Sequence, residues 1–133
     1  MSVYKMNIRT KVKTDFYEIT SEVQGIITSS GVKDGVCYIF VPHTTAAITI
    51  NEHADPDVIE DITARLDELV PQNLNYRHIE GNSSGHIKAS LLGSSQVVFI
   101  ENGKLVLGTW QGIFFCEFDG PRTRNILVKI TNS

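Results

Sequence analysis

Strand-like and helix-like patterns do not alternate regularly along this chain, and their order constrains the fold more than any other feature. The order is strand, helix, two strands, helix, polar loop and then strands again. A parallel doubly wound fold needs a helix between successive strands, so that class is excluded. The order and the length of 133 residues predict one α+β domain over residues 1–133, with largely antiparallel, sandwich-like β-sheets and two main helices.

The first thirty residues combine two periodicities. Residues 3–13 alternate between apolar and polar side chains, which predicts a half-buried strand. Asp15 then resembles a helix N-cap, with Glu18 placed to reach back in a capping box, and apolar residues recur at helical spacing. This second pattern predicts a helix over residues 15–30.

The middle of the chain predicts two strands and a second helix. Two runs of β-branched and aromatic residues, 35–41 and 44–50, predict two strands or one bent strand, with His43 at a strand edge. Asp55 is a suitable N-cap followed by proline, so a helix should begin there and end before Pro71. The predicted buried face of this helix consists of Val58, Ile59, Ile62, Leu66 and Leu69.

The second half of the chain opens with a polar, aperiodic loop over residues 72–85, a kind of segment that is often functional in a compact domain. The Asn102-Gly103 pair suits the two positive φ angles of a type I′ turn and predicts a β-hairpin. The Asp119-Gly120-Pro121 turn is flanked by a further strand pair. The remaining predicted elements are a short helix over 86–92 and strands over 96–101, 104–107, 112–118 and 125–130.

Charge and apolar content exclude several partners. A formal net charge of -3 at pH 7 provides no diffuse positive field, so we expect no nucleic-acid partner. No apolar run approaches the roughly 20 residues of a membrane helix, and the first residues do not resemble a signal peptide, so we expect a cytoplasmic protein without a membrane partner. Cys37 and Cys116 lie in apolar strand-like runs, which predicts buried thiols.

Three of the four histidines lie where side chains can converge on a cleft. His43, His78 and His86 fall at element ends or in the polar loop. Imidazole is the commonest transition-metal ligand, and three histidines with an open position are typical of a catalytic zinc centre. Their spacing contains no short metal-binding signature, so surface or capping roles stay open for all three.

Among the carboxylates, Glu117 is the best candidate for chemistry. It alternates in line with apolar residues of its predicted strand, where a carboxylate is costly to bury without a partner. Glu52 leaves the strand before the second helix, and Asp61 lies beside the apolar stripe of that helix. Acids near a helix N-terminus also stabilise the helix dipole, so a purely structural role stays open for Asp61.

Arg122 and Arg124 follow the Asp-Gly-Pro turn, which should place their guanidinium groups beside a strand end. A guanidinium suits bidentate phosphate capture, and pairing with the nearby acids is the alternative. Thr44, Thr45 and Ser90 supply hydroxyls close to the histidines in the sequence. The sequence has no Walker-type loop, GxSxG elbow or GxGxxG run, so those routes to nucleotide binding or serine hydrolysis lack support.

Three long motifs resemble the YjbQ-like family, small proteins named for a secondary thiamine-phosphate synthase activity. The motifs are PHTTAAITINE (42–52), HIEGNSSGHIKASLLG (78–93) and GTWQGIFFCEFDGPRTR (108–124). The resemblance covers nearly the whole chain and implies a compact α+β fold, a homotrimer and a metal-binding cleft. We expect a divalent metal, with zinc as the first choice because imidazole suits it.

The residue patterns and the motif positions of the resemblance together give the expected site, without a separate catalytic role for each carboxylate. The motif histidines His43, His78 and His86 are the expected metal ligands. The expected catalytic residues are Glu117, Asp61 and Glu52. The residues expected to bind a small phosphorylated substrate are Thr44, Thr45, Asn82, Ser90, Gln111 and Arg122.

Three functions stay open at this point. A transferase would join a pyrimidine pyrophosphate to a thiazole phosphate and release pyrophosphate, with a metal and Arg122 stabilising the leaving group. A metal-dependent hydrolase would use metal-bound water, with Glu117 as the general base. The third function is a non-enzymatic trimer that binds metal or anions.

Overall fold

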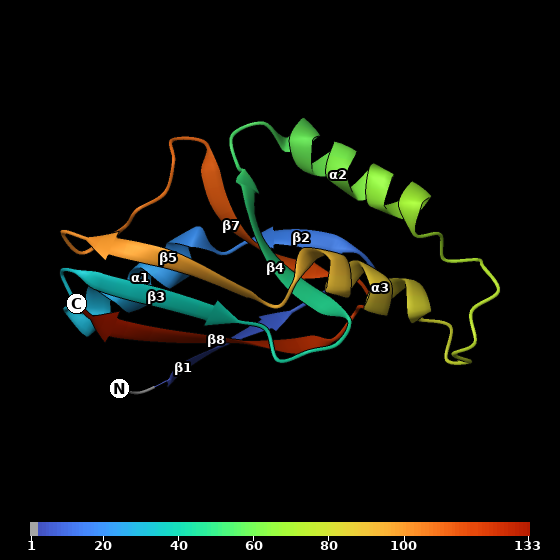
Figure 1. Cartoon of the computed structure of the whole chain (residues 1–133), viewed down its shortest axis with the longest axis horizontal. Coiled ribbons are helices and arrows are strands. Elements are labelled where there is room, and N and C mark those ends of the chain that lie inside the picture. Colours follow the sequence, from blue (N-terminus) through green and yellow to red (C-terminus); the bar gives the residue numbers. More distant parts are fainter. Residues whose placement is uncertain (1–2) are drawn as a thin grey trace.

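Eight strands and three helices make up the computed structural model, which describes residues 3–133 (Figure 1). The strands are β1 (Val3–Arg9), β2 (Asp15–Glu18), β3 (Gly35–Phe40), β4 (Ala46–Glu52), β5 (Ser95–Glu101), β6 (Lys104–Leu105), β7 (Gln111–Glu117) and β8 (Thr123–Asn132). The helices are α1 (Thr20–Ser30), α2 (Pro56–Leu69) and α3 (Ser83–Leu92). The larger sheet has the order β1-β8-β3-β5-β6 and the smaller sheet the order β2-β7-β4, with antiparallel pairing throughout. The predicted α+β class is confirmed.

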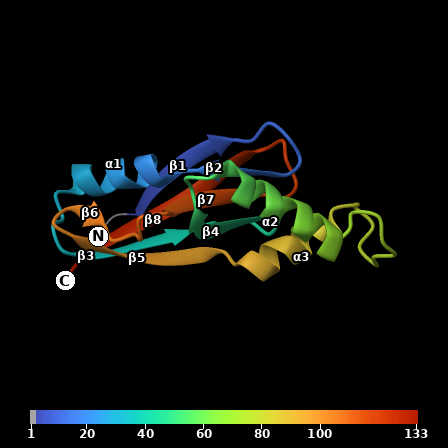
Figure 2. The same ribbon diagram turned by 90° about the horizontal axis from the view of Figure 1, so that it is seen from above.

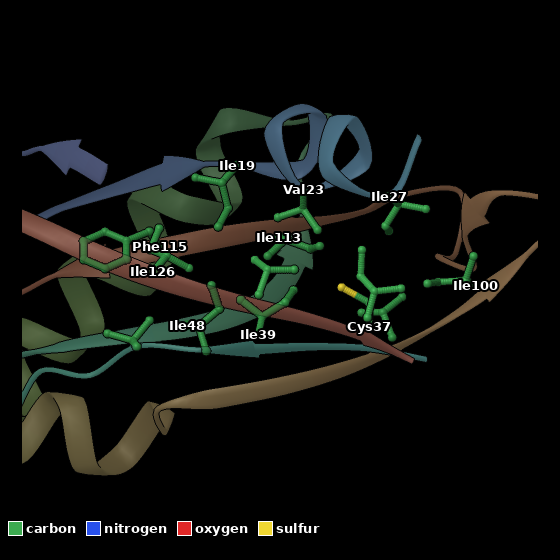
Figure 3. Packing of buried hydrophobic residues seen from close by; sticks show 14 of the residues in the cluster. Ile19, Val23, Ile27, Cys37, Ile39, Ile48, Ile100, Ile113, Phe115 and Ile126 are labelled. Carbon is green, nitrogen blue, oxygen red and sulfur yellow. The ribbon is translucent and has the colours of Figure 1, made fainter. Parts of the chain in front are cut away.

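The smaller sheet is covered on both faces, whereas the larger sheet is covered on one. Inward residues of both sheets and of α1 form the main core, in which Val23, Ile39 and Ile113 converge (Figure 3). The opposite face of the smaller sheet packs against α2 and α3, which lie at the same end of the molecule (Figure 2). Since β7 is the central strand of the smaller sheet, residues 112–118 are all buried, which explains the apolar run over 113–116.

The prediction of one helix over residues 15–30 is wrong at its start. Residues 15–18 form β2 and pair with β7, with Asp15 opposite Glu117. The Asp15 carboxylate accepts a hydrogen bond from the amide of Phe16 and caps no helix. Pairing with β7 gives these backbone groups partners and buries Phe16, and α1 begins only at Thr20.

The strands that flank the Asp-Gly-Pro turn do not pair with each other, which corrects the predicted strand pair. β7 lies in the smaller sheet and β8 in the larger one, so the turn carries the chain between sheets. The predicted loop over 72–85 is also shorter, because α3 begins at Ser83. A buried helix start satisfies more backbone groups than a loop would at the same place.

Several local predictions are confirmed. Asn102 and Gly103 have φ angles of 53° and 75°, as the hairpin between β5 and β6 requires. The Asp55 carboxylate accepts the amide hydrogen of Asp57 at 2.9 Å and caps α2. Cys37 and Cys116 are buried free thiols. Among residues 3–133, no helix has the length and apolar character needed to cross a membrane.

The apolar face of α2 is less buried than predicted. Ile59, Ile62 and Leu66 pack against the cluster on the smaller sheet, but no residue of the helix is fully buried. Leu69 is 74% exposed. A face that covers only three short strands leaves part of a helix of this length in contact with solvent.

Candidate functional site

Two connections between the sheets meet at one end of the molecule and build a cleft of 460 Å³. His43 lies in the connection from β3 to β4, and Arg122 in the connection from β7 to β8. Both connections lie at the same end because Ala46 pairs with Glu117 across β4 and β7. The cleft is lined by Pro42, His43, Thr44, Thr45, His78, Glu80, Asn82, His86, Asp119, Arg122 and Arg124.

A buried ion pair lies beneath the cleft. Glu117 is fully buried, and its Oε1 accepts hydrogen bonds from Arg124 Nε at 2.8 Å and from the Thr10 hydroxyl at 2.7 Å. Its Oε2 accepts from Arg124 Nη2 and from the amide of Asp119. Burial raises the pKa of Glu117, but the hydrogen bonds from Arg124 and Thr10 outweigh it, so the pKa lies below its usual value.

This arrangement corrects the role expected for Glu117. Both carboxylate oxygens already accept hydrogen bonds, and the lowered pKa makes the group a poor proton acceptor. Its partner is Arg124 and not Arg122. Glu117 therefore holds Arg124 in place and does not serve as a general base.

Arg124 was considered with Arg122 as a phosphate-binding group but is missing from the expected substrate-binding residues. It is only 4% exposed, yet it lines the cleft. Its Nε and Nη2 bond to Glu117 and to the Thr45 hydroxyl, whereas Nη1 makes none of the hydrogen bonds found among residues 3–133. Its position on β8, in alternation with buried Ile126 and Val128, was the signal in the sequence that it points inward.

Arg122 lies at the rim of the cleft and is more exposed. It bonds to the Asp119 carboxylate through Nη2 and to the Asp119 carbonyl through Nε, each at 2.8 Å. Asn82 Nδ2 donates to the same carboxylate at 2.9 Å, while Asn82 Oδ1 is buried without a hydrogen-bond partner among the described residues. Burial raises the pKa of Asp119, but the hydrogen bonds from Asn82 and Arg122 outweigh burial, so the pKa lies below its usual value. The group is therefore ionised near neutral pH.

The three predicted histidines all line this cleft, but they do not form one ligand set. The rings of His78 and His86 lie edge to face with centroids 5.4 Å apart. His43 Nε2 accepts a hydrogen bond from the amide of Asn125 at 2.9 Å, so the neutral ring carries its proton on Nδ1. Burial, followed by the charge of Arg124, lowers the pKa of His43 and favours this neutral form.

The geometry does not fit a three-histidine metal site. Within residues 3–133, no group of three or more His, Cys, Asp or Glu side chains is placed to hold a metal ion. A metal-bound histidine usually donates a hydrogen bond from its second ring nitrogen, whereas His43 Nε2 accepts one. His43 therefore keeps its proton on Nδ1, and the divalent metal stays a prediction.

Other predicted residues divide between the cleft and the far end of the smaller sheet. Thr44 and Thr45 line the cleft, and Ser90 lines an adjoining cavity. Glu52 and Gln111 pair at the opposite end of β4 and β7, six residues from the Ala46–Glu117 pair, which is about 20 Å away along a strand.

The residues at the far end of the smaller sheet form hydrogen bonds with residues close to them in the sequence. Glu52 accepts hydrogen bonds from the amides of Ala54 and Asp55, and Gln111 accepts one from the amide of Gly108. Asp61 is exposed on α2 and does not line the cleft. Within one chain, the expectation that Glu52, Asp61 and Gln111 join the histidines is therefore wrong.

The chain matches the family described as UPF0047 protein YjbQ-like over residues 4–133. It belongs to the YjbQ-like UPF0047 family. A UPF0047 protein of Methanocaldococcus jannaschii is 54% identical over 96% of this chain and 93% of its own length. The UPF0047 protein YugU of Bacillus subtilis is 50% identical over 94% of this chain and 96% of its own.

Solved structures of YjbQ-like proteins have the same fold. One from Clostridium acetobutylicum is 55% identical, covers 96% of this chain and 99% of its own, and has a TM-score of 0.94. One from Sulfolobus solfataricus has the same TM-score at 39% identity and covers 99% of both chains. These matches confirm the family and the fold. They do not extend to thiamine-phosphate synthesis or to metal binding, so the reaction is argued from the site.

Proposed function

We propose that this YjbQ-like protein binds a small phosphorylated substrate in the histidine cleft and acts on it by acid–base chemistry. The observation that carries the proposal is Arg124, a buried guanidinium fixed by Glu117 beneath a cleft that neutral His43 also lines. Guanidinium groups bind phosphate oxygens in charge-assisted pairs, and a site with little water strengthens such pairs. Arg122 at the rim adds a second guanidinium to the same cleft.

The roles divide by protonation state. Arg124 and Arg122 stay charged and would stabilise the negative charge that develops on a departing phosphate or pyrophosphate. His43 donates from Nδ1, and imidazole is suited to proton transfer near neutral pH. His86 lines the same cleft and is the second candidate for proton transfer. Thr44 and Asn82 would orient the phosphate oxygens.

The first reaction to test is the one that the resemblance implies, in which a pyrimidine pyrophosphate and a thiazole phosphate join through a C–N bond. Pyrophosphate leaves in this reaction, and the two arginines match the charge of that leaving group. Hydrolysis of a phosphorylated small molecule is the alternative, with an imidazole in place of Glu117 as the base. A protein that only binds anions or metal would show phosphate affinity without turnover of either kind.

Anion titration tests the proposal directly. Phosphate and pyrophosphate are titrated by calorimetry into the wild type and Arg122→Lys, with the melting temperature measured alongside. We expect weaker anion binding at an unchanged melting temperature, because lysine keeps the charge but loses the planar fork. Arg65→Lys is the matched control, since Arg65 is an exposed arginine that pairs with an acid at the same i,i+3 spacing. No anion binding by the wild type would contradict the proposed function.

Turnover and metal content are measured separately. The two thiamine precursors are incubated with the protein, with and without a chelator, and pyrophosphate release is followed. Metal analysis of untagged wild type, His78→Ala and His86→Ala tests the predicted divalent metal, zinc first. Full metal occupancy in both variants would show that these histidines are not ligands.

The predicted homotrimer is also part of the proposal, and the outer face of the larger sheet supports it. Tyr38 and Phe40 on β3, with Val97 and Phe99 on β5, are 45–65% exposed and neighbour one another in the sheet. The accessible surface of 7732 Å² exceeds the roughly 7,000 Å² expected for a monomer of this mass.

We infer that further copies of this chain cover this face, and light scattering tests it. Phe99→Asp should reduce the molar mass in solution, because a buried carboxylate without a partner opposes association. Leu69→Asp is the control, since Leu69 is still more exposed but lies on α2. A monomeric wild type at micromolar concentration would contradict the trimer.

A further inference from the structure

A second cavity adjoins the charged cleft and differs from it in chemistry. It has a volume of 510 Å³ and shares His43, Thr44 and His86 with the first. Its other lining residues are Ala46, Ala89, Ser90, Gly93 and Ser94. None of these carries a formal charge, whereas the first cavity includes Arg122 and Arg124. We refer to the two cavities as the neutral lobe and the charged lobe.

The neutral lobe is suited to an uncharged organic group. It contains no guanidinium or ammonium, so a second phosphate would lose its hydration there without gaining a charged partner. Ala46 and Ala89 are only 1% and 8% exposed and close the floor of this lobe, so the surface that a carbon ring can cover comes from its uncharged side chains, including Thr44. The Ser90 hydroxyl donates to the carbonyl of His86 at 2.9 Å, so its oxygen faces a ligand only as an acceptor.

The shared residues define where the two lobes meet. His43 and His86 come from different elements, the β3–β4 connection and α3, and both line both lobes. A ligand that occupied both lobes would therefore lie against both imidazoles. The group that joins its phosphate to its organic part would then lie beside the two side chains proposed for proton transfer.

We propose that the neutral lobe binds the uncharged organic part of the substrate while the charged lobe binds its phosphate. This inference rests on the proposed phosphate binding and adds the substrate class, a monoester of phosphate with an uncharged ring or short chain. The junction between His43 and His86 then selects substrates in which the two parts are directly linked.

Benzyl phosphate and inorganic phosphate are the probes, and their affinities are measured by calorimetry. The wild type should bind benzyl phosphate more tightly by about tenfold or more, because the ring buries apolar surface in the neutral lobe. Ser90→Phe should fill that lobe and remove this advantage, while the affinity for inorganic phosphate changes by less than about twofold. Ser90 is exposed on α3, so the substitution should not disturb the fold.

Two further variants make the result decisive. Ile87→Phe places the same ring on α3 one turn earlier, outside both lobes, and should change neither affinity. Ser94→Leu should repeat the effect of Ser90→Phe from the other side of the neutral lobe. If phosphate binds but Ser90→Phe and Ser94→Leu leave the affinity for benzyl phosphate unchanged, only this inference is wrong. If neither probe binds the wild type, the proposed function fails and the inference fails with it.

Discussion

The two ends of the β4–β7 strand pair carry similar charged groups in opposite environments. At the cleft end, Glu117 and Arg124 form a fully buried pair with side-chain exposures of 0% and 5%. At the far end, Glu18 Oε2 lies 2.8 Å from His53 Nδ1, and both side chains are at least a third exposed. The first pair is shielded from solvent and the second is not, so we expect the fold to depend more on the first pair.

The physical reason is the cost of desolvation. A charge taken out of water is stable only with a close partner, so removal of one partner leaves a large unfavourable term. Solvent screens an exposed pair and replaces a lost partner, so the same deletion has little effect there.

Arg124→Leu should have the largest effect. It leaves the Glu117 carboxylate buried without its guanidinium, and the free energy of unfolding should fall by about 3–5 kcal/mol. Urea denaturation measures this. The double variant Glu117→Leu/Arg124→Leu should recover part of the loss, because no uncompensated charge is left. A double variant no more stable than Arg124→Leu would attribute the loss to packing instead.

Acid should weaken the cleft end before the far end. The folded pKa of Glu117 is lowered, so its stabilisation is present above the unfolded pKa and is lost as the pH falls through the folded pKa. Asp119 contributes in the same sense. Urea denaturation from about pH 7 to about pH 3 should show a steeper loss for the wild type than for Glu117→Gln. An equal pH dependence of the free energy of unfolding in both proteins would mean that protonation of Glu117 does not affect stability.

Asp55→Ala should have a smaller effect at the far end. It removes the side-chain cap from the amide of Asp57 and should lower the free energy of unfolding by about 1 kcal/mol. Thermal denaturation measures it, with Glu60→Ala as the control because Glu60 is exposed one turn further along α2. A loss as large as that of Arg124→Leu would contradict the contrast between the two ends.

The smallest effect is expected for the Glu18–His53 pair. The hydrogen bond that His53 donates to the Glu18 carboxylate raises the pKa of His53, so its stabilisation is fully present below the ordinary histidine pKa and is lost as the pH rises through the folded value. An NMR titration should show that Glu18→Gln lowers the pKa of His53 and leaves that of His43 unchanged. A His53 pKa that does not move would show that the contact contributes nothing in solution.

Local patterns in the sequence predicted most elements correctly. The Asn102-Gly103 turn and the Asp55 cap depend on residues adjacent in the chain, so their chemistry is visible without the fold. The start of α1 was predicted wrongly because Asp15 and Glu18 imitate a capping box. Their true partners lie on β7, about a hundred residues later, and no local pattern reports such a pairing.

The candidate site was also predicted only in part from local patterns. The sequence motifs correctly placed His43, His78, His86 and Arg122 around one cleft. They did not separate the roles of the two arginines, because Arg124 on β8 and Glu117 on β7 belong to different sheets. Their contact depends on how the two sheets pack together. The motifs also did not show that Glu52 lies at the far end of β4, because the order of motifs in a sequence does not give the distances between them in the fold.

The sequence by itself determined the α+β class, the positions of most strands and helices, and which side chains could bind a ligand or transfer a proton. These features depend on periodicity, turn chemistry and side-chain type. The tertiary structure decided which of those residues meet and which are buried. It assigned Glu117 to hold Arg124, made His43 the acceptor of a hydrogen bond from the amide of Asn125, and placed Glu52 at the far end. Contacts between distant segments and the desolvation that accompanies them set those roles, and neither is a property of a local stretch of chain.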